Sequence, residues 1–99
     1  MITHVVLFKF KDENKAANIA ASVQRLEAMV GRVPSLRGLE VGCHGAPSAR
    51  SLDLALVTRF DDMDGLSAYA DDPFHGEVKK FLAGVLETSY VVDFESRVG

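Results

Sequence analysis

The sequence predicts an α+β domain whose elements follow in the order β, α, β, β, α, β. Four short segments are rich in β-branched and aromatic residues, and they alternate with segments whose apolar residues repeat at helical spacing. Aspartate, glycine and proline stand where these segments meet, as expected for helix caps and turns. This order is the split βαβ pattern of a ferredoxin-like sandwich.

Composition and charge exclude several classes of protein. The 99 residues are 47% hydrophobic and 25% charged, which predicts one globular domain over residues 1–99. The net charge of -3 comes without a basic block, so we expect no nucleic-acid partner. Neither a cleavable leader nor an apolar run of about 20 residues is recognisable, which predicts a cytoplasmic protein with no membrane partner. Cys43 is the single cysteine, and with His44 it supplies too few ligands for a structural metal site, so we expect no metal.

The first predicted strand, residues 2–10, is apolar on both faces. Alternation places one set of side chains on one face, namely Ile2, His4, Val6, Phe8 and Phe10, and it places Val5 and Leu7 on the other. An isolated antiparallel sheet normally leaves one face to water. A chain of this length also buries only about 60–70% of its unfolded surface. We therefore expect helices on one face and a second copy of the chain on the other, in a homodimer.

The remaining boundaries follow from caps and periodicity. Asp12 is expected to cap a helix over about residues 13–30, with an apolar stripe at Ile19, Val23, Leu26 and Val30. Gly31 and Pro34 end it. Strands are expected at 36–42, 52–60 and 88–94, with a hairpin loop at 42–51.

Two short helices are expected between the third and fourth strands. Acidic residues 61–64 are expected to cap the first of them, which carries Leu66, Tyr69 and Ala70 near one face. Asp72 at the N-cap and Pro73 at the first helical position then begin a second helix that continues to about Gly84. The pair should therefore bend at Pro73.

Four stretches together resemble the stress-responsive dimeric α/β-barrel (Dabb) family across nearly the whole chain. They are His-Val-Val-Leu-Phe-Lys-Phe-Lys at 4–11, Asp-Leu-Ala-Leu-Val at 53–57, Tyr-Ala-Asp-Asp-Pro-Phe-His at 69–75 and Val-Val-Asp-Phe at 91–94. The resemblance implies a dimer in which two sheets form a shared barrel with the helices outside. Some relatives are enzymes, among them a plant polyketide cyclase that closes a linear polyketide by intramolecular aldol chemistry.

The resemblance to the cyclase also implies a site. Its catalytic tyrosine and histidine correspond to Tyr69 and His75 through a shared Tyr-x-x-x-Pro-x-His pattern, and its pocket histidine corresponds to His4. A ligand-binding lining is expected from His4, Val6, Phe8, Val23 and Leu26. Ser22, Val23 and Leu26 stand where the cyclase has aromatic residues, which predicts a different substrate. No glycine-rich nucleotide motif is present, so no cofactor is expected.

The residues themselves leave two interpretations of the Tyr69 and His75 pair. His75 lies near the positive end of a helix dipole, while Asp71 and Asp72 act in the opposite sense, so the sign of its pKa shift is open. A neutral His75 would serve as a general base, and the Tyr69 hydroxyl would donate to an enolate-like oxygen. In the alternative interpretation, the Tyr69 ring packs in the core, its hydroxyl bonds a backbone carbonyl, and His75 helps to cap its helix.

The remaining polar residues of interest are His4, two strand aspartates and a pair of lysines. His4 is expected on the helix-covered face, either as a pocket residue or as a core histidine with a hydrogen-bond partner. Asp53 and Asp93 are interpreted as strand-end charges, not as a paired-carboxylate site. Lys79 and Lys80 are interpreted as a solvated helix face.

Three functions remain open from the sequence. The leading one is a homodimer that binds an apolar or aromatic small molecule in a cavity lined by His4, Tyr69 and His75. In the second, that cavity catalyses cofactor-free proton transfer or aldol cyclisation of an enolisable carbonyl compound. In the third, the dimer is a non-catalytic, stress-associated accessory protein. A deep cavity would favour the first two and a filled core the third.

Overall fold

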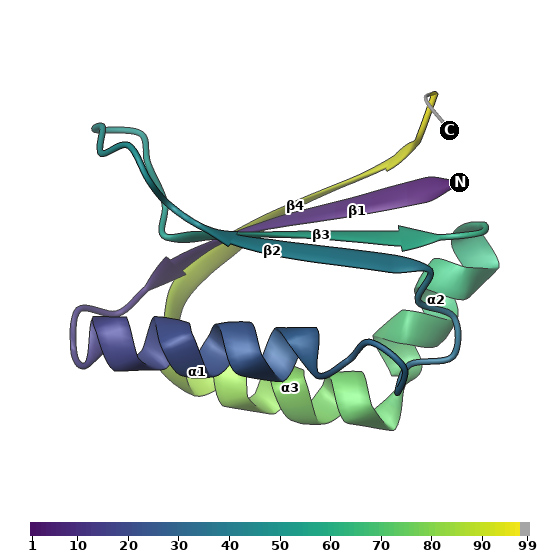
Figure 1. The fold of residues 1–99 in the computed structure, drawn as a ribbon, viewed down its shortest axis with the longest axis horizontal. Helices are drawn as coiled ribbons and strands as arrows, with labels where there is room; N and C mark the ends of the chain where they lie inside the picture. Colours follow the sequence, from purple (N-terminus) through teal and green to yellow (C-terminus); the bar gives the residue numbers. More distant parts are fainter. Residues whose placement is uncertain (98–99) are drawn as a thin grey trace.

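The computed structural model describes residues 1–97, which form one antiparallel sheet with helices against one of its faces (Figure 1). The four strands lie in the order β2-β3-β1-β4, so β1 is central and β4 is an edge strand. The elements in chain order are β1 Ile2–Phe10, α1 Lys15–Glu27, β2 Gly38–Cys43, β3 Leu54–Phe60, α2 Met63–Asp71, α3 Pro73–Val85 and β4 Leu86–Glu95. The predicted ferredoxin-like α+β fold is confirmed.

The core lies between the sheet and the helices. Strand register puts Ile2 opposite Phe60 and Val6 opposite Leu56, so alternate residues of β1 and β3 share the helix-covered face. Tyr69, Val78 and Leu82 meet them from α2 and α3, and α1 contributes Leu26. The alternation seen in the sequence thus assigns the β1 faces as predicted.

Helix α1 differs from the prediction at both ends. It begins at Lys15 after Asn14, which adopts a left-handed conformation (φ 53°) with no side-chain cap. Asp12 is therefore not the N-cap; its carboxylate is solvent-exposed and forms an ion pair with Lys15. The helix ends at Glu27 and the chain then turns. Val30 is therefore 60% exposed and is not part of the buried stripe that the sequence predicted. Met29 and Val33 fill the buried positions instead.

The junction between α2 and α3 forms as predicted. Asp62 caps α2 by accepting a hydrogen bond from the Gly65 N–H, 2.9 Å away. Asp72 caps α3, where its Oδ1 accepts from the N–H groups of Phe74 at 2.8 Å and His75 at 3.2 Å. Pro73 occupies the first helical position, where its missing N–H costs no hydrogen bond. The bend fixes where the two helices direct their inward side chains.

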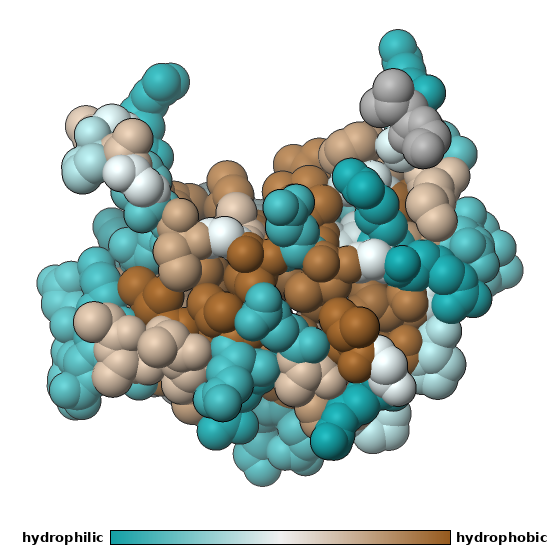
Figure 2. All heavy atoms as spheres, viewed as in Figure 1, coloured by the Kyte–Doolittle hydropathy of each residue, from teal (hydrophilic) through white to brown (hydrophobic). Residues whose placement is uncertain are grey.

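The second face of the sheet carries no helix (Figure 1). Pairing places Leu7 opposite Tyr90 and Val5 opposite Val92 on this face, which we call the open face. Val92 is 63% exposed, and Leu7, Tyr90 and Phe94 are exposed as well. Figure 2 shows apolar residues in the hollow between the two projections formed by the β2–β3 loop and the end of β4. The open face is thus an apolar surface without a covering element in residues 1–97.

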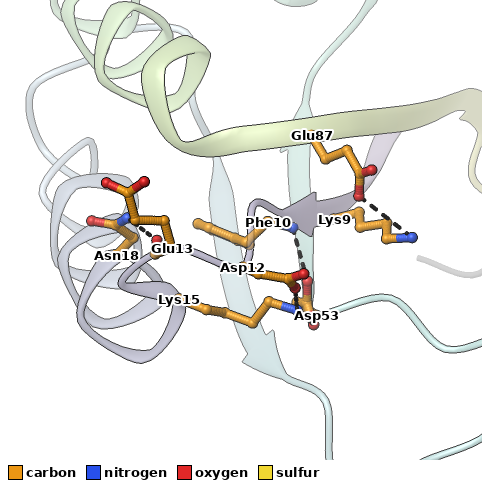
Figure 3. A network of polar contacts seen from close by, with 8 residues as sticks. All are labelled: Lys9, Phe10, Asp12, Glu13, Lys15, Asn18, Asp53 and Glu87. Carbon is orange, nitrogen blue, oxygen red and sulfur yellow. Dashed lines mark hydrogen bonds and ion pairs between the residues drawn. The ribbon is translucent and has the colours of Figure 1, made fainter.

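Asp53 fastens the end of β1 to the start of β3. Its Oδ2 accepts a hydrogen bond from the Phe10 N–H at 2.8 Å, where the β1–β4 register shifts, and its N–H donates to the Phe8 carbonyl at 2.9 Å. Lys15 lies between Asp53 and Asp12 and pairs with both (Figure 3). Asp53 therefore has the structural role that the sequence indicated, and it anchors the first strand.

Replacing Asp53 with alanine should destabilise the fold. The substitution leaves the buried Phe10 N–H without its acceptor, which is expected to cost about 1–3 kcal/mol in the free energy of unfolding. Asp12→Ala is the matched control, because Asp12 pairs with the same lysine but is fully exposed, and it should leave stability unchanged. Urea denaturation of both variants measures the difference. Equal effects of the two substitutions would contradict this role.

Candidate functional site

A cavity of about 400 Å³ lies between the helix-covered face of the sheet and α3. Its walls are mainly apolar, and β1, β3, β4, α1, α2 and α3 all contribute to them. The apolar lining comprises Val6, Phe8, Leu26, Leu56, Val78, Leu82, Ala83, Leu86 and Val91. Five polar side chains join them: His4, Tyr69, His75, Lys79 and Ser89. An apolar enclosure with a few polar groups is the usual form of a small-molecule site.

His4 reaches this cavity because it lies on the inward face of the central strand. The register puts it directly opposite Asp93 on β4, and its Nδ1–H donates a hydrogen bond to Asp93 Oδ1. The side chain of His4 is 15% exposed and that of Asp93 is 36% exposed. Since Nδ1 is occupied, the Nε2 atom of His4 is left for other contacts, and no group in residues 1–97 hydrogen-bonds it.

Tyr69 packs between the two histidines. Its ring centroid lies 5.8 Å from that of His4, edge to face, and 3.8 Å from that of His75, stacked. The residue is only 2% exposed, and this burial raises the pKa of the Tyr69 hydroxyl, so the group stays protonated at neutral pH. Within residues 1–97 the hydroxyl has no hydrogen-bond partner, which differs from the backbone bond that one interpretation assigned to it.

His75 is held by the backbone of the preceding helix. Its Nδ1 lies 2.9 Å from the Tyr69 carbonyl oxygen, and because a carbonyl only accepts, the proton must be on Nδ1. The same carbonyl, at the C-terminal end of α2, also accepts a hydrogen bond from the Asp72 N–H at 3.2 Å, so the His75 ring adds a second bond to it. The other ring nitrogen, Nε2, then carries a lone pair when the ring is neutral.

The structure settles the sign of the His75 shift that the sequence left open. Burial lowers the pKa of His75, and the positive charge of Lys79 lowers it further. The hydrogen bond to Tyr69 and the charge of Asp72 act in the opposite direction but are outweighed. His75 is therefore mainly neutral near pH 7, in the form that accepts a proton.

The structure brings most of the predicted site residues together. Val6, Phe8 and Leu26 line the cavity with the three polar side chains. Val23 does not; it packs against the core one helical turn before Leu26. The sequence interpretation missed Asp93, which is a partner of His4 as well as a strand-end charge. Strand alternation places His4 on the inward face. Its pairing with Asp93 follows only once the β1–β4 register is known.

Lys79 lines the cavity, although the sequence interpretation assigned it elsewhere. It was interpreted as part of a solvated helix face, and although exposed it also lines the cavity. The available signal was its spacing of four residues from His75, which puts both side chains on one side of α3.

Metal and membrane features are absent from the described part of the chain. Residues 1–97 contain no cluster of three or more histidine, cysteine, aspartate or glutamate side chains that would hold a metal ion. Over the same range, none of the helices combines the length and apolar character needed to cross a bilayer.

The fold and this cavity define a class of protein: a ferredoxin-like α+β domain with a mainly apolar chamber beneath its sheet. Within that class, the chain belongs to the family described as the Stress responsive A/B Barrel Domain (Dabb), whose model matches residues 2–96. The resemblance noted in the sequence is thereby confirmed.

Individual relatives agree with this assignment. The chain is 30% identical over 80 residues to a stress-response A/B barrel domain-containing protein of Arabidopsis thaliana, an alignment that covers 81% of this chain and 30% of the plant protein. The chain thus spans less than a third of that relative. A dimeric protein of unknown function from Bacteroides fragilis is 31% identical with a TM-score of 0.87, covering 96% of this chain and 95% of that one. A dimeric ferredoxin-like protein from Thermobifida fusca is 26% identical with the same TM-score, covering 96% and 90%.

The lowered pKa of His75 predicts how stability depends on pH. In the unfolded chain His75 titrates near its ordinary value of about 6.5, whereas the folded protein holds it neutral to lower pH. Its contribution to stability is therefore complete above pH ~6.5 and is lost as pH falls through the folded pKa. His75→Asn, which does not titrate, should flatten this dependence in urea denaturation between about pH 7 and 5.

Nuclear magnetic resonance tests the same assignment directly. The nitrogen spectrum of His75 should show the Nδ1–H tautomer at pH 7, with a titration midpoint below the ordinary histidine value. A midpoint at or above about 6.5 would contradict it.

Proposed function

We propose that this protein is a homodimer that binds an apolar or aromatic small molecule in the cavity lined by His4, Tyr69 and His75. The single observation that carries the proposal is the cavity itself, about 400 Å³ in volume, with apolar walls and these polar groups on its lining. A purely structural dimer has no need of an apolar recess that is partly open to solvent and carries several hydrogen-bonding groups, which is the usual form of a ligand site. The cavity therefore favours ligand binding over the accessory-protein alternative.

The dimer is supported by the open face. Leu7, Tyr90 and Val92 form an apolar surface on a sheet whose other side already packs on the helices. Permanent dimers bury about 2,000 Å² or more of mainly apolar surface, and a sheet face supplies such a surface. The relatives from Bacteroides fragilis and Thermobifida fusca are both described as dimeric, which supports the same assembly here.

Catalysis of proton transfer is the second candidate, favoured by the arrangement of His75 and Tyr69. His75 Nδ1 is bound to a carbonyl, so Nε2 is the free base, and the protonated Tyr69 hydroxyl has no partner in residues 1–97. In an aldol cyclisation, Nε2 would take a proton from the carbon next to a carbonyl while Tyr69 donates to the developing enolate oxygen. The enolate carbon then bonds to a second carbonyl carbon, and the proton on Nε2 passes to the new alkoxide.

His4 has a supporting role in either function. Asp93 fixes its ring by accepting the Nδ1–H, which directs Nε2 to a ligand oxygen or hydroxyl. The edge contact with the Tyr69 ring also limits how Tyr69 can move. His4 is therefore proposed as a ligand-orienting residue, with Asp93 as its positioning partner.

The dimer is tested by sedimentation velocity at micromolar concentration. The wild type should sediment with about twice the 10.8 kDa chain mass. Val92→Lys, on the open face, should shift the protein towards monomer because a buried apolar interface excludes an unpaired charge. Val30→Lys is the matched control, since Val30 is similarly exposed but lies outside the sheet, and it should stay dimeric. A wild-type monomer, or a Val92→Lys dimer as stable as the wild type, would contradict the proposed interface.

The catalytic candidate is tested by screening β-polyketones and related enolisable substrates. His75→Ala should lower turnover by about 10²–10⁴-fold, the usual contribution of a general base. Tyr69→Phe keeps the packed ring and removes the donor, so it should lower the rate by about 10²–10³-fold with little loss of stability. His44→Ala, in the exposed β2–β3 loop, is the control and should leave the rate unchanged. Activity that persists in both site variants would reject these roles. If the wild type binds such compounds without turning them over, the protein is a binding protein and not a catalyst of this reaction.

A further inference from the structure

Lys79 gives the cavity a positive charge at one position of its lining. It follows His75 by one helical turn on α3, so both side chains lie on the same side of the helix. Lys79 and His75 both line the cavity, and the positive charge of Lys79 contributes to the lowered pKa of His75. Among the described residues that line the cavity, Lys79 is the only lysine, arginine, aspartate or glutamate.

This charge has no counter-ion among the described residues. Lys9 pairs with Glu87, and Lys15 pairs with two aspartates, but Lys79 forms no ion pair within residues 1–97. Its Nζ donates one hydrogen bond, to the Ala70 carbonyl 3.2 Å away. An ammonium group has three donors, so two remain for a ligand. The Asp93 carboxylate is paired with His4 and not with Lys79.

We propose that Lys79 makes the cavity selective for ligands that join an ionised carboxylate to an apolar body. The inference rests on the proposed ligand-binding function and names its substrate class. The apolar walls take the body of the ligand, and the Lys79 ammonium pairs with its carboxylate beside His75. A single lysine matches a single negative charge, whereas a phosphate group usually requires several cations or a bidentate arginine, which this lining lacks.

The same pairing would orient a reactive ligand. A carboxylate held at Lys79 fixes one end of the molecule, so an oxo group farther along the chain is presented to His75 and Tyr69 in a constant direction. The substrates of the catalytic candidate are then expected to be oxo acids, and their neutral esters should bind less well. Lys79 is thus a specificity-determining residue in this proposal, and His75 remains the base.

Decanoate and decanol provide a matched pair of probes, because they share an apolar chain and differ in charge. Isothermal titration calorimetry at pH 7.5 should show that the wild type binds decanoate about tenfold more tightly than decanol, the low end for a hydrogen bond to a charged group. Lys79→Met keeps the aliphatic stem and should remove this preference by lowering decanoate affinity to about that of decanol. Lys80→Met is the control, because Lys80 is exposed and does not line the cavity, and it should retain the preference.

The outcomes separate this proposal from the one on which it rests. Equal affinity of the wild type for the two probes, or a decanoate preference that survives Lys79→Met, would overturn the role of Lys79 while leaving cavity binding in place. If Lys80→Met loses the decanoate preference as Lys79→Met does, the preference comes from general surface charge and the proposal is overturned. If the wild type binds neither probe, the role of Lys79 and the proposed ligand-binding function are both contradicted. Neither probe is enolisable under these conditions, so the result is independent of catalysis.

Discussion

The central position of β1 between β3 and β4 is the constraint on which the site depends. Antiparallel pairing on both sides fixes which residues of β1 face inward, because a shift of one residue would turn every side chain to the opposite face. That register places His4 against Asp93 and beneath Tyr69, and it sends Leu7 to the open face. Asp53 holds the far end of β1 in place through the Phe10 N–H. The position of His4 in the cavity is therefore a consequence of strand pairing.

The bend at Pro73 supplies the other half of the site. Asp72 ends α2 and caps α3, and it brings His75 back over the last turn of α2, where the ring donates to the Tyr69 carbonyl. This one bond holds the His75 ring against the end of α2 and selects the tautomer with a free Nε2. The structural and the chemical interpretation of His75 are compatible, because they use different nitrogen atoms of the same ring.

Much of this arrangement was accessible from the sequence, and the exceptions have physical reasons. Strand alternation identified His4 as inward-facing, and the Asp72-Pro73 pair located the second helix start, because both signals are local. The contact between His4 and Asp93 was missed, because it depends on a register between strands 89 residues apart in the chain.

The sign of the His75 pKa shift was equally inaccessible from the sequence. It depends first on burial, which only packing reveals, and then on Lys79, whose spacing of four residues from His75 the sequence did contain. At the start of α1 the local signal itself misled, since Asp12 is a good capping residue but Asn14, which tolerates the left-handed conformation, sets the boundary instead.

Strand β4 links the two surfaces that the proposed function requires. Its residues alternate between the cavity side, where Val91 and Asp93 lie, and the open face, where Val92 and Phe94 lie. As an edge strand it is paired on one side only, so its outer part has little to hold it in the isolated chain. In the proposed dimer, a partner packed on Val92 would restrain the same segment that positions Asp93 against His4. Dimer assembly and site geometry would then be coupled through the alternating side chains of one strand. A variant that weakens the dimer should therefore also weaken the contact between Asp93 and His4.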